Sequence, residues 1–149
     1  MTVHSLRTRA LAVTPIRVGL GLLLLVAARA AGAANGPALL AFGLGALGIT
    51  FLVFNDPRAR FAAGQVEPLD LPDDAVLAPP WRQGLAATLP STVGVAVLAV
   101  VALVAEPVLG ALLAGVCAGL GLASLLSLTR LDPALFADPR THVVYRRAA

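Results

Sequence analysis

Acidic residues near the middle of the chain are the first candidates for chemistry. Asp70, Asp73 and Asp74 lie in one short segment, and aspartate clusters can hold Mg²⁺ against a phosphate substrate. The segment is rich in proline, however, and lacks the helical spacing that would aim three carboxylates at one point. No second group of carboxylates elsewhere completes a two-metal site. We therefore expect a solvated linker here, and a metal-dependent enzyme at the membrane surface is the weaker alternative.

Two other charged residues flank long apolar segments. Arg29 follows the first such segment and Glu106 separates the last two. This placement allows an ion pair between Arg29 and Glu106, whereas the simpler expectation is that each side chain meets water or lipid headgroups.

The remaining motifs of this kind point away from catalysis. Residues 43–48 match G-x-G-x-x-G, but they lie inside an apolar run without a preceding strand, so a dinucleotide site is not expected. Cys117, His4 and His142 are too isolated in the sequence for nucleophilic or metal chemistry. The sequence predicts no catalytic residue, no cofactor and no metal.

The composition places the chain in a membrane. Of its 149 residues, 58% are hydrophobic and 13% charged, and the mean hydropathy is +0.88; soluble domains have about 25% charged residues. This excludes a disordered chain and a conventional water-soluble enzyme, and the single cysteine excludes a disulfide scaffold. All eleven basic residues are arginine, which suggests a GC-rich bacterium and its cytoplasmic membrane.

The gaps between charges predict the membrane spans. Residues 30–55, 83–105 and 107–129 contain no charge, and a helix crosses a ~30 Å hydrocarbon core with about 20 residues. These runs lack the alternation of a β-barrel strand, so helices are expected. The prediction is an all-α integral membrane protein with one domain, 1–149, and helices at 37–54, 85–105 and 107–128. A loop at 55–84 and a tail at 129–149 complete it.

The first helix is expected at 12–34. The uncharged stretch between Arg17 and Arg29 is short for a span, but arginine side chains near a boundary can extend to the headgroups. The alternative is a cleaved secretory signal, with Arg7, Arg9 and Arg17 as its basic region and 18–26 as its apolar core.

An internal repeat favours retention of this helix. Residues 15–19 (PIRVG) resemble 90–94 (PSTVG), residues 36–41 resemble 110–114, and Asp-Pro-Arg occurs at 56–58 and 138–140. Matches in the same order are typical of duplication. We expect a four-helix transmembrane bundle of two tandem two-helix hairpins, related by an axis along the membrane normal.

The arginines predict the orientation. Ten of them lie in the N-terminal segment, the loop and the tail, and only Arg29 lies on the other side. The positive-inside rule therefore places both termini and the loop in the cytoplasm. The two outer turns are expected at 35–37 and 106–107.

Small residues recur at helical spacing in two predicted helices. Such faces let helix backbones approach closely, either within one chain or between copies in a homo-oligomer. The candidate helix-packing residues are Ala111, Gly115, Gly119, Ala41, Gly45 and Gly48.

Arginine and tryptophan beside the spans suit the layer of anionic headgroups. The candidate lipid-headgroup contacts are Arg58, Arg60, Trp81, Arg82, Arg130, Arg140, Arg146 and Arg147. Lipid is the expected partner rather than nucleic acid, because these arginines flank spans and lack an ordered aromatic platform. Docking of the acidic loop on the basic tail is a further alternative.

These features favour a non-catalytic scaffold or accessory subunit of the membrane. An oligomeric pore or transporter for a small solute is the alternative, and it would need a continuous polar stripe. The candidates for that stripe are Thr50, Ser91, Thr92, Ser124, Ser127 and Thr129. The enzyme that uses the aspartate cluster is the second alternative.

Overall fold

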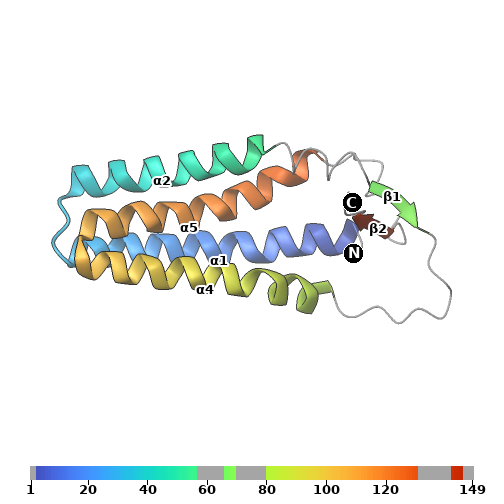
Figure 1. Cartoon of the computed structure of the whole chain (residues 1–149), viewed down its shortest axis with the longest axis horizontal. Coiled ribbons are helices and arrows are strands. Elements are labelled where there is room, and N and C mark those ends of the chain that lie inside the picture. The colour runs from blue at the N-terminus through green and yellow to red at the C-terminus, as the bar shows by residue number, and fades with distance from the viewer. Residues whose placement is uncertain (1–2, 57–65, 70–79, 131–141, 146–149) are drawn as a thin grey trace.

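Four long helices lie side by side in the computed structural model (Figure 1). It describes residues 3–56, 66–69, 80–130 and 142–145. The elements are α1 (Val3–Ala30), α2 (Asn35–Asn55), β1 (Val66–Leu69), α4 (Pro80–Ala105), α5 (Pro107–Ser127), the 3-10 turn η1 (Leu128–Arg130) and β2 (His142–Tyr145).

The first hairpin turn lies earlier than expected. α1 begins at Val3 and ends at Ala30, and the chain reverses through residues 31–34, where Gly32 has a φ of 106°. That conformation costs glycine little because it has no Cβ. The predicted turn at 35–37 is instead the first turn of α2, where a proline loses no helical hydrogen bond because the first N–H groups of a helix have no partner.

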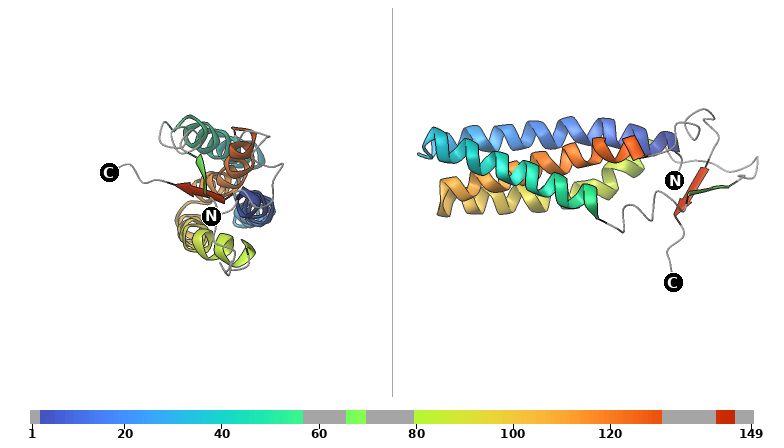
Figure 2. Two further views of the ribbon diagram at one scale, coloured as in Figure 1. Left: turned by 90° about the vertical axis from the view of Figure 1, so that its right-hand side faces the viewer. Right: turned by 90° about the horizontal axis from the view of Figure 1, so that it is seen from above.

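The second turn lies where the sequence placed it. α4 ends at Ala105 and α5 begins at Pro107. Glu106 is the N-cap, with extended backbone, and its carboxylate accepts a hydrogen bond from the Val108 N–H at 3.2 Å. Both short turns lie at one end of the helices, which we call the turn end, and the N-terminus and both strands lie at the other (Figures 1 and 2).

α5 is the central helix. It packs along α2, α1 and α4, and α1 also packs along α4. The two helices of the first hairpin contact each other little, so α2 rests almost entirely on α5 (Figure 2). The packing of the two hairpins is therefore unequal, because α4 and α5 contact each other far more than α1 and α2 do.

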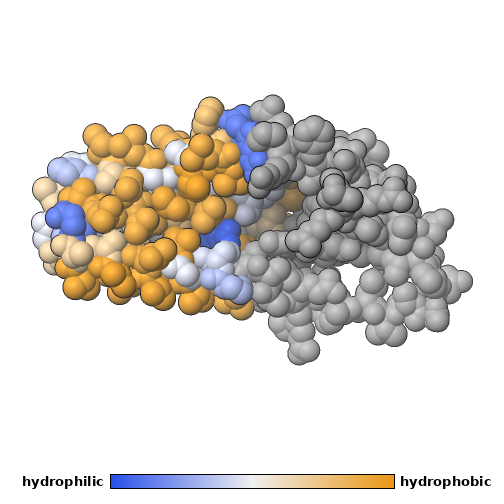
Figure 3. All heavy atoms as spheres, in the orientation of Figure 1, coloured by the Kyte–Doolittle hydropathy of each residue, from blue (hydrophilic) through white to orange (hydrophobic). Residues whose placement is uncertain are grey.

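Small side chains fill the interior and large ones cover the outside. Most of the buried apolar residues are alanines, whereas leucine and valine dominate the exposed set, as in Leu23 at 69%, Leu47 at 71% and Val104 at 81% exposure. Figure 3 shows the resulting apolar band along the helices. In water each exposed Å² would cost about 25 cal/mol. In lipid it costs nothing, so large apolar side chains belong outside.

Three helices are long and apolar enough to cross a membrane: Ala10–Ala30, Asn35–Asn55 and Pro107–Ser127. The apolar part of α4 whose side chains are described, Leu89–Ala105, is shorter. The chain is thus compatible with a multi-pass membrane protein.

The two strands were not predicted. β1 and β2 pair antiparallel, with Val66 opposite Tyr145 and Leu69 opposite His142. This backbone pairing joins the loop and the tail, which the sequence suggested only as a docking of opposite charges.

Candidate functional site

A buried arginine lies between α1 and α4. Arg17 is only 7% exposed. Its Nε donates to Thr92 Oγ1 at 2.9 Å, and its Nη2 donates to Ser91 Oγ at 2.7 Å. The sequence suggested that this side chain extends towards the membrane boundary, but the hydroxyls of α4 hold its guanidinium inside the bundle.

The depth of Arg17 follows from helix geometry. It lies thirteen residues before Ala30, which at 1.5 Å per residue is about 20 Å from the turn end. Ser91 lies fourteen residues before Ala105, at almost the same depth. The Arg17 side chain therefore extends across the bundle to α4, and its guanidinium lies at about the same depth as the backbone of Arg17.

Close approach of α1 to α5 fixes the base of this side chain. A Cβ added to Gly121 would lie 3.1 Å from both the Arg17 Cβ and the Thr14 carbonyl oxygen. The Thr14 hydroxyl donates to the Gly121 carbonyl at 3.0 Å. Glycine at position 121 thus lets the two backbones meet beside Arg17.

Another hydroxyl joins α2 to α5 near this depth. Thr50 Oγ1 lies 2.7 Å from the carbonyl oxygen of Ala46 and 3.1 Å from that of Gly119, so it can donate across the helix interface. We call Thr14, Arg17, Thr50, Ser91 and Thr92 the polar layer. The hydrogen bonds described here connect α1 to α4, α1 to α5 and α2 to α5.

The other residues suggested for a polar stripe bond locally. Ser124 donates to the carbonyl of Leu120, Ser127 to that of Ser124, and Thr129 to that of Leu126, at 2.7–2.8 Å. Hydroxyls satisfied within their own helix are compatible with an apolar environment. These hydrogen bonds are local to the end of α5 and η1, and they do not connect to the polar layer.

Glycines form the contact between α2 and α5. A Cβ on Gly115 would overlap the carbonyl oxygen of Phe42, one on Gly119 that of Ala46, and one on Gly45 that of Leu112. Ala41 and Ala111 are buried, at 9% and 0% exposure. A Cβ on Gly48 would meet nothing within 4 Å. Five of the six candidate packing residues therefore lie in the interior and Gly48 does not.

The parallel helices contact each other at the spacing of the sequence repeat. Gly115 lies against Phe42 and Gly119 against Ala46, an offset of 73 residues in both cases, which is the offset of the matching Leu-Leu-Ala segments. Arg17 and Thr92 are 75 residues apart, which is the offset of the matching PIRVG and PSTVG segments. Residues that the matching sequence segments align thus face each other.

Arg29 and Glu106 lie at the turn end, and both are exposed. The Glu106 carboxylate caps α5, and in the described part of the chain no ion pair joins it to Arg29. Both side chains therefore lie on the surface of the turn end.

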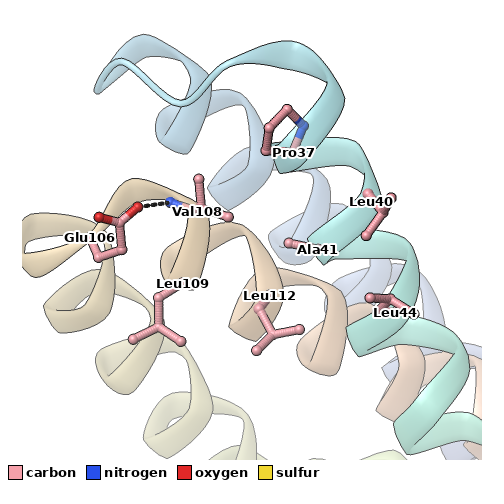
Figure 4. A pocket seen from close by; sticks show the side chains of 8 residues that line it. All are labelled: Pro37, Leu40, Ala41, Leu44, Glu106, Val108, Leu109 and Leu112. Atoms are coloured by element: carbon pink, nitrogen blue, oxygen red, sulfur yellow. Dashed lines mark hydrogen bonds between the residues drawn. The ribbon is translucent and has the colours of Figure 1, made fainter.

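An apolar groove lies between α2 and α5 at the turn end (Figure 4). Its volume is about 460 Å³. Leu40, Ala41 and Leu44 line it from α2, Leu109 and Leu112 line it from α5, and Glu106 is the one charged residue that borders it. The sequence did not predict this groove, because it depends on how α2 crosses α5.

Most of the proposed headgroup contacts lie outside the described residues, namely Arg58, Arg60, Arg140, Arg146 and Arg147, as do Asp70, Asp73 and Asp74. Trp81 and Arg82 lie in the first turn of α4 and Arg130 ends η1. Among the described residues, no group of three or more His, Cys, Asp or Glu side chains could hold a metal ion.

One signal in the sequence could have led to the Arg17 site. The matching segments at 15–19 and 90–94 align Arg17 with Thr92, and these two residues are in contact. We compared the chain with known proteins, and no family model, curated protein or solved structure gives a significant match.

Proposed function

We propose that this chain is a non-catalytic membrane component, a small scaffold or accessory subunit. The observation that carries the proposal is the filled interior. Glycine-to-backbone contacts at Gly45, Gly115 and Gly119 close the space between α2 and α5 beyond the groove at the turn end, and the described hydrogen bonds of the polar layer join helices to one another. This arrangement leaves the outer helix faces and the two ends of the bundle as the surfaces on which the protein can act.

The scaffold role predicts that the protein binds other protein chains. Affinity purification of the full chain in mild detergent is expected to yield a homo-oligomer or a complex with another membrane protein, because a scaffold or accessory subunit acts by binding other proteins. Size-exclusion chromatography with light scattering measures the mass, and mass spectrometry identifies what co-purifies. A chain that runs alone as a monomer would contradict the proposal.

The buried Arg17 favours a second candidate, an oligomeric pore or transporter for a small anion. Ionisable residues inside a membrane bundle often mark ion or substrate pathways. Anion flux through vesicles that contain the protein, lost in Arg17→Met, would favour this candidate. Absence of flux in vesicles with correctly folded protein leaves the scaffold role.

We further propose that the bundle arose from two tandem hairpins and that both termini face the cytoplasm. The offsets of 73 and 75 residues at the parallel contacts support the duplication, and the excess of arginine in the N-terminal segment, the loop and the tail supports the orientation.

The orientation can be measured with single cysteines on a background in which Cys117 is replaced by alanine. Asn35→Cys, at the turn end, is expected to react with an impermeant maleimide in intact cells. Asp56→Cys, at the other end of α2, is expected to react only after permeabilisation. The reverse pattern would contradict the proposed orientation.

A further inference from the structure

The groove between α2 and α5 combines an apolar floor with one charge at the turn end. Leu40, Leu44 and Leu109 are 65%, 62% and 45% exposed, so the groove opens on the outer surface of the bundle. In a multi-pass protein that surface faces lipid. A lipid acyl chain is the apolar object of suitable shape that is always present there.

Glu106 determines which lipid fits. Its Oε1 accepts the Val108 N–H at 3.2 Å, which fixes the carboxylate beside the first turn of α5 (Figure 4). It lies between two apolar helices that end together, at the level expected for headgroups. A carboxylate there attracts an ammonium group and forms charge-assisted hydrogen bonds with it, and it repels an anionic headgroup.

We propose that this groove is a binding site for a phospholipid with a primary-amine headgroup. One acyl chain lies along Leu40, Leu44 and Leu112, and the headgroup ammonium donates to Glu106. The assignment rests on the membrane location of the helices and is independent of the scaffold role. A quaternary amine has the charge but no N–H, and a glycerol headgroup has neither, so the expected order is phosphatidylethanolamine, then phosphatidylcholine, then phosphatidylglycerol.

Native mass spectrometry of the full chain, titrated with these three lipids, tests the order. The wild-type protein is expected to bind phosphatidylethanolamine on the order of 10-fold more tightly than phosphatidylcholine, which corresponds to about 1.4 kcal/mol. Equal binding of the three lipids by the wild-type protein would overturn the proposal, whatever the variants do. The same spectra report the oligomeric state, so failure of the scaffold role is seen separately.

Two variants separate charge from position. Glu106→Gln keeps an oxygen that can accept the Val108 N–H and removes the charge, so the preference for the ethanolamine lipid is expected to disappear while the fold is retained. Arg29→Gln removes an exposed charge at the same end, outside the groove lining, and is expected to keep the preference. If Glu106→Gln keeps the preference for the ethanolamine lipid, or if both variants lose it equally, the role of Glu106 is overturned.

A second pair tests the groove itself. Leu44→Trp is expected to fill the groove and to weaken the binding of all three lipids several-fold, because the larger indole ring occupies the place of the acyl chain. Leu47→Trp, on an exposed position of α2 that does not line the groove, is expected to change little. Equal effects of the two substitutions would overturn the groove as the site.

Discussion

Gly115→Ala is expected to destabilise the protein, and Gly115→Leu to abolish the packing of α2 on α5. A Cβ at position 115 overlaps the carbonyl oxygen of Phe42. A backbone atom inside a helix cannot rotate away as a side chain can, so the helices must separate. Overpacking of this kind costs about 1–3 kcal/mol for a small group, and more for leucine. Helix propensity offsets part of this cost, since alanine is favoured over glycine by about 1 kcal/mol. Because the overlap is with a backbone oxygen, we expect a cost in the upper part of the overpacking range and a net loss of about 1–2 kcal/mol for alanine.

Gly48→Ala is the matched control. Both glycines lie in apolar helices of equal length, but a Cβ at Gly48 meets nothing within 4 Å. This substitution is expected to be neutral or to stabilise by up to about 1 kcal/mol. The free energy of unfolding in lipid bicelles, measured by steric trapping, compares the two. A neutral Gly115→Ala, or a Gly48→Ala of equal cost, would contradict the α2–α5 contact described above.

The contrast between these glycines shows what periodicity can and cannot predict. Spacing of four residues places small side chains on one face of a helix, but it does not say which face meets a neighbour. Gly45 and Gly48 are three apart and looked equivalent, yet α5 lies against Gly45 alone. The composition is so rich in alanine and glycine that several faces of α2 carry small residues, and only the crossing of two helices selects one.

The positions of the helices were largely predictable for a physical reason. A charge is costly in hydrocarbon, so the uncharged runs 30–55, 83–105 and 107–129 had to contain the apolar helices. The start of α1 was not predictable in this way, because a helix continues beyond the bilayer without any change of pattern. The first turn was misplaced because Asn35-Gly36-Pro37 resembles a turn, while the first turn of a helix accepts the same residues. The two strands depend on a pairing between distant segments, and no local pattern reports such a pairing.

Two sets of substitutions at the Arg17 site are expected to differ in how much they lower the free energy of unfolding. Replacing both hydroxyl partners, as Ser91→Ala with Thr92→Val, is expected to cost about 3–5 kcal/mol, because it strips a buried permanent charge of two hydrogen bonds. Arg17→Met removes the charge with the donors. The hydroxyls left behind can bond to carbonyls of their own helix, so the expected cost is about 1–3 kcal/mol.

The order of these two stability losses shows whether the buried charge of Arg17 stabilises the bundle or is only held in place by its hydrogen bonds. Burial of a guanidinium costs several kcal/mol. Removing the arginine removes that cost, whereas removing the Ser91 and Thr92 hydroxyls leaves the charge buried and takes away two of its hydrogen bonds. Steric trapping of both variants, with Thr14→Val as a control that removes only the bond to Gly121, measures the difference. If Arg17→Met proves less stable than the double variant, the charge itself stabilises the bundle. The polar layer would then be the first place to search for a bound anion, and the transport candidate would gain over the scaffold.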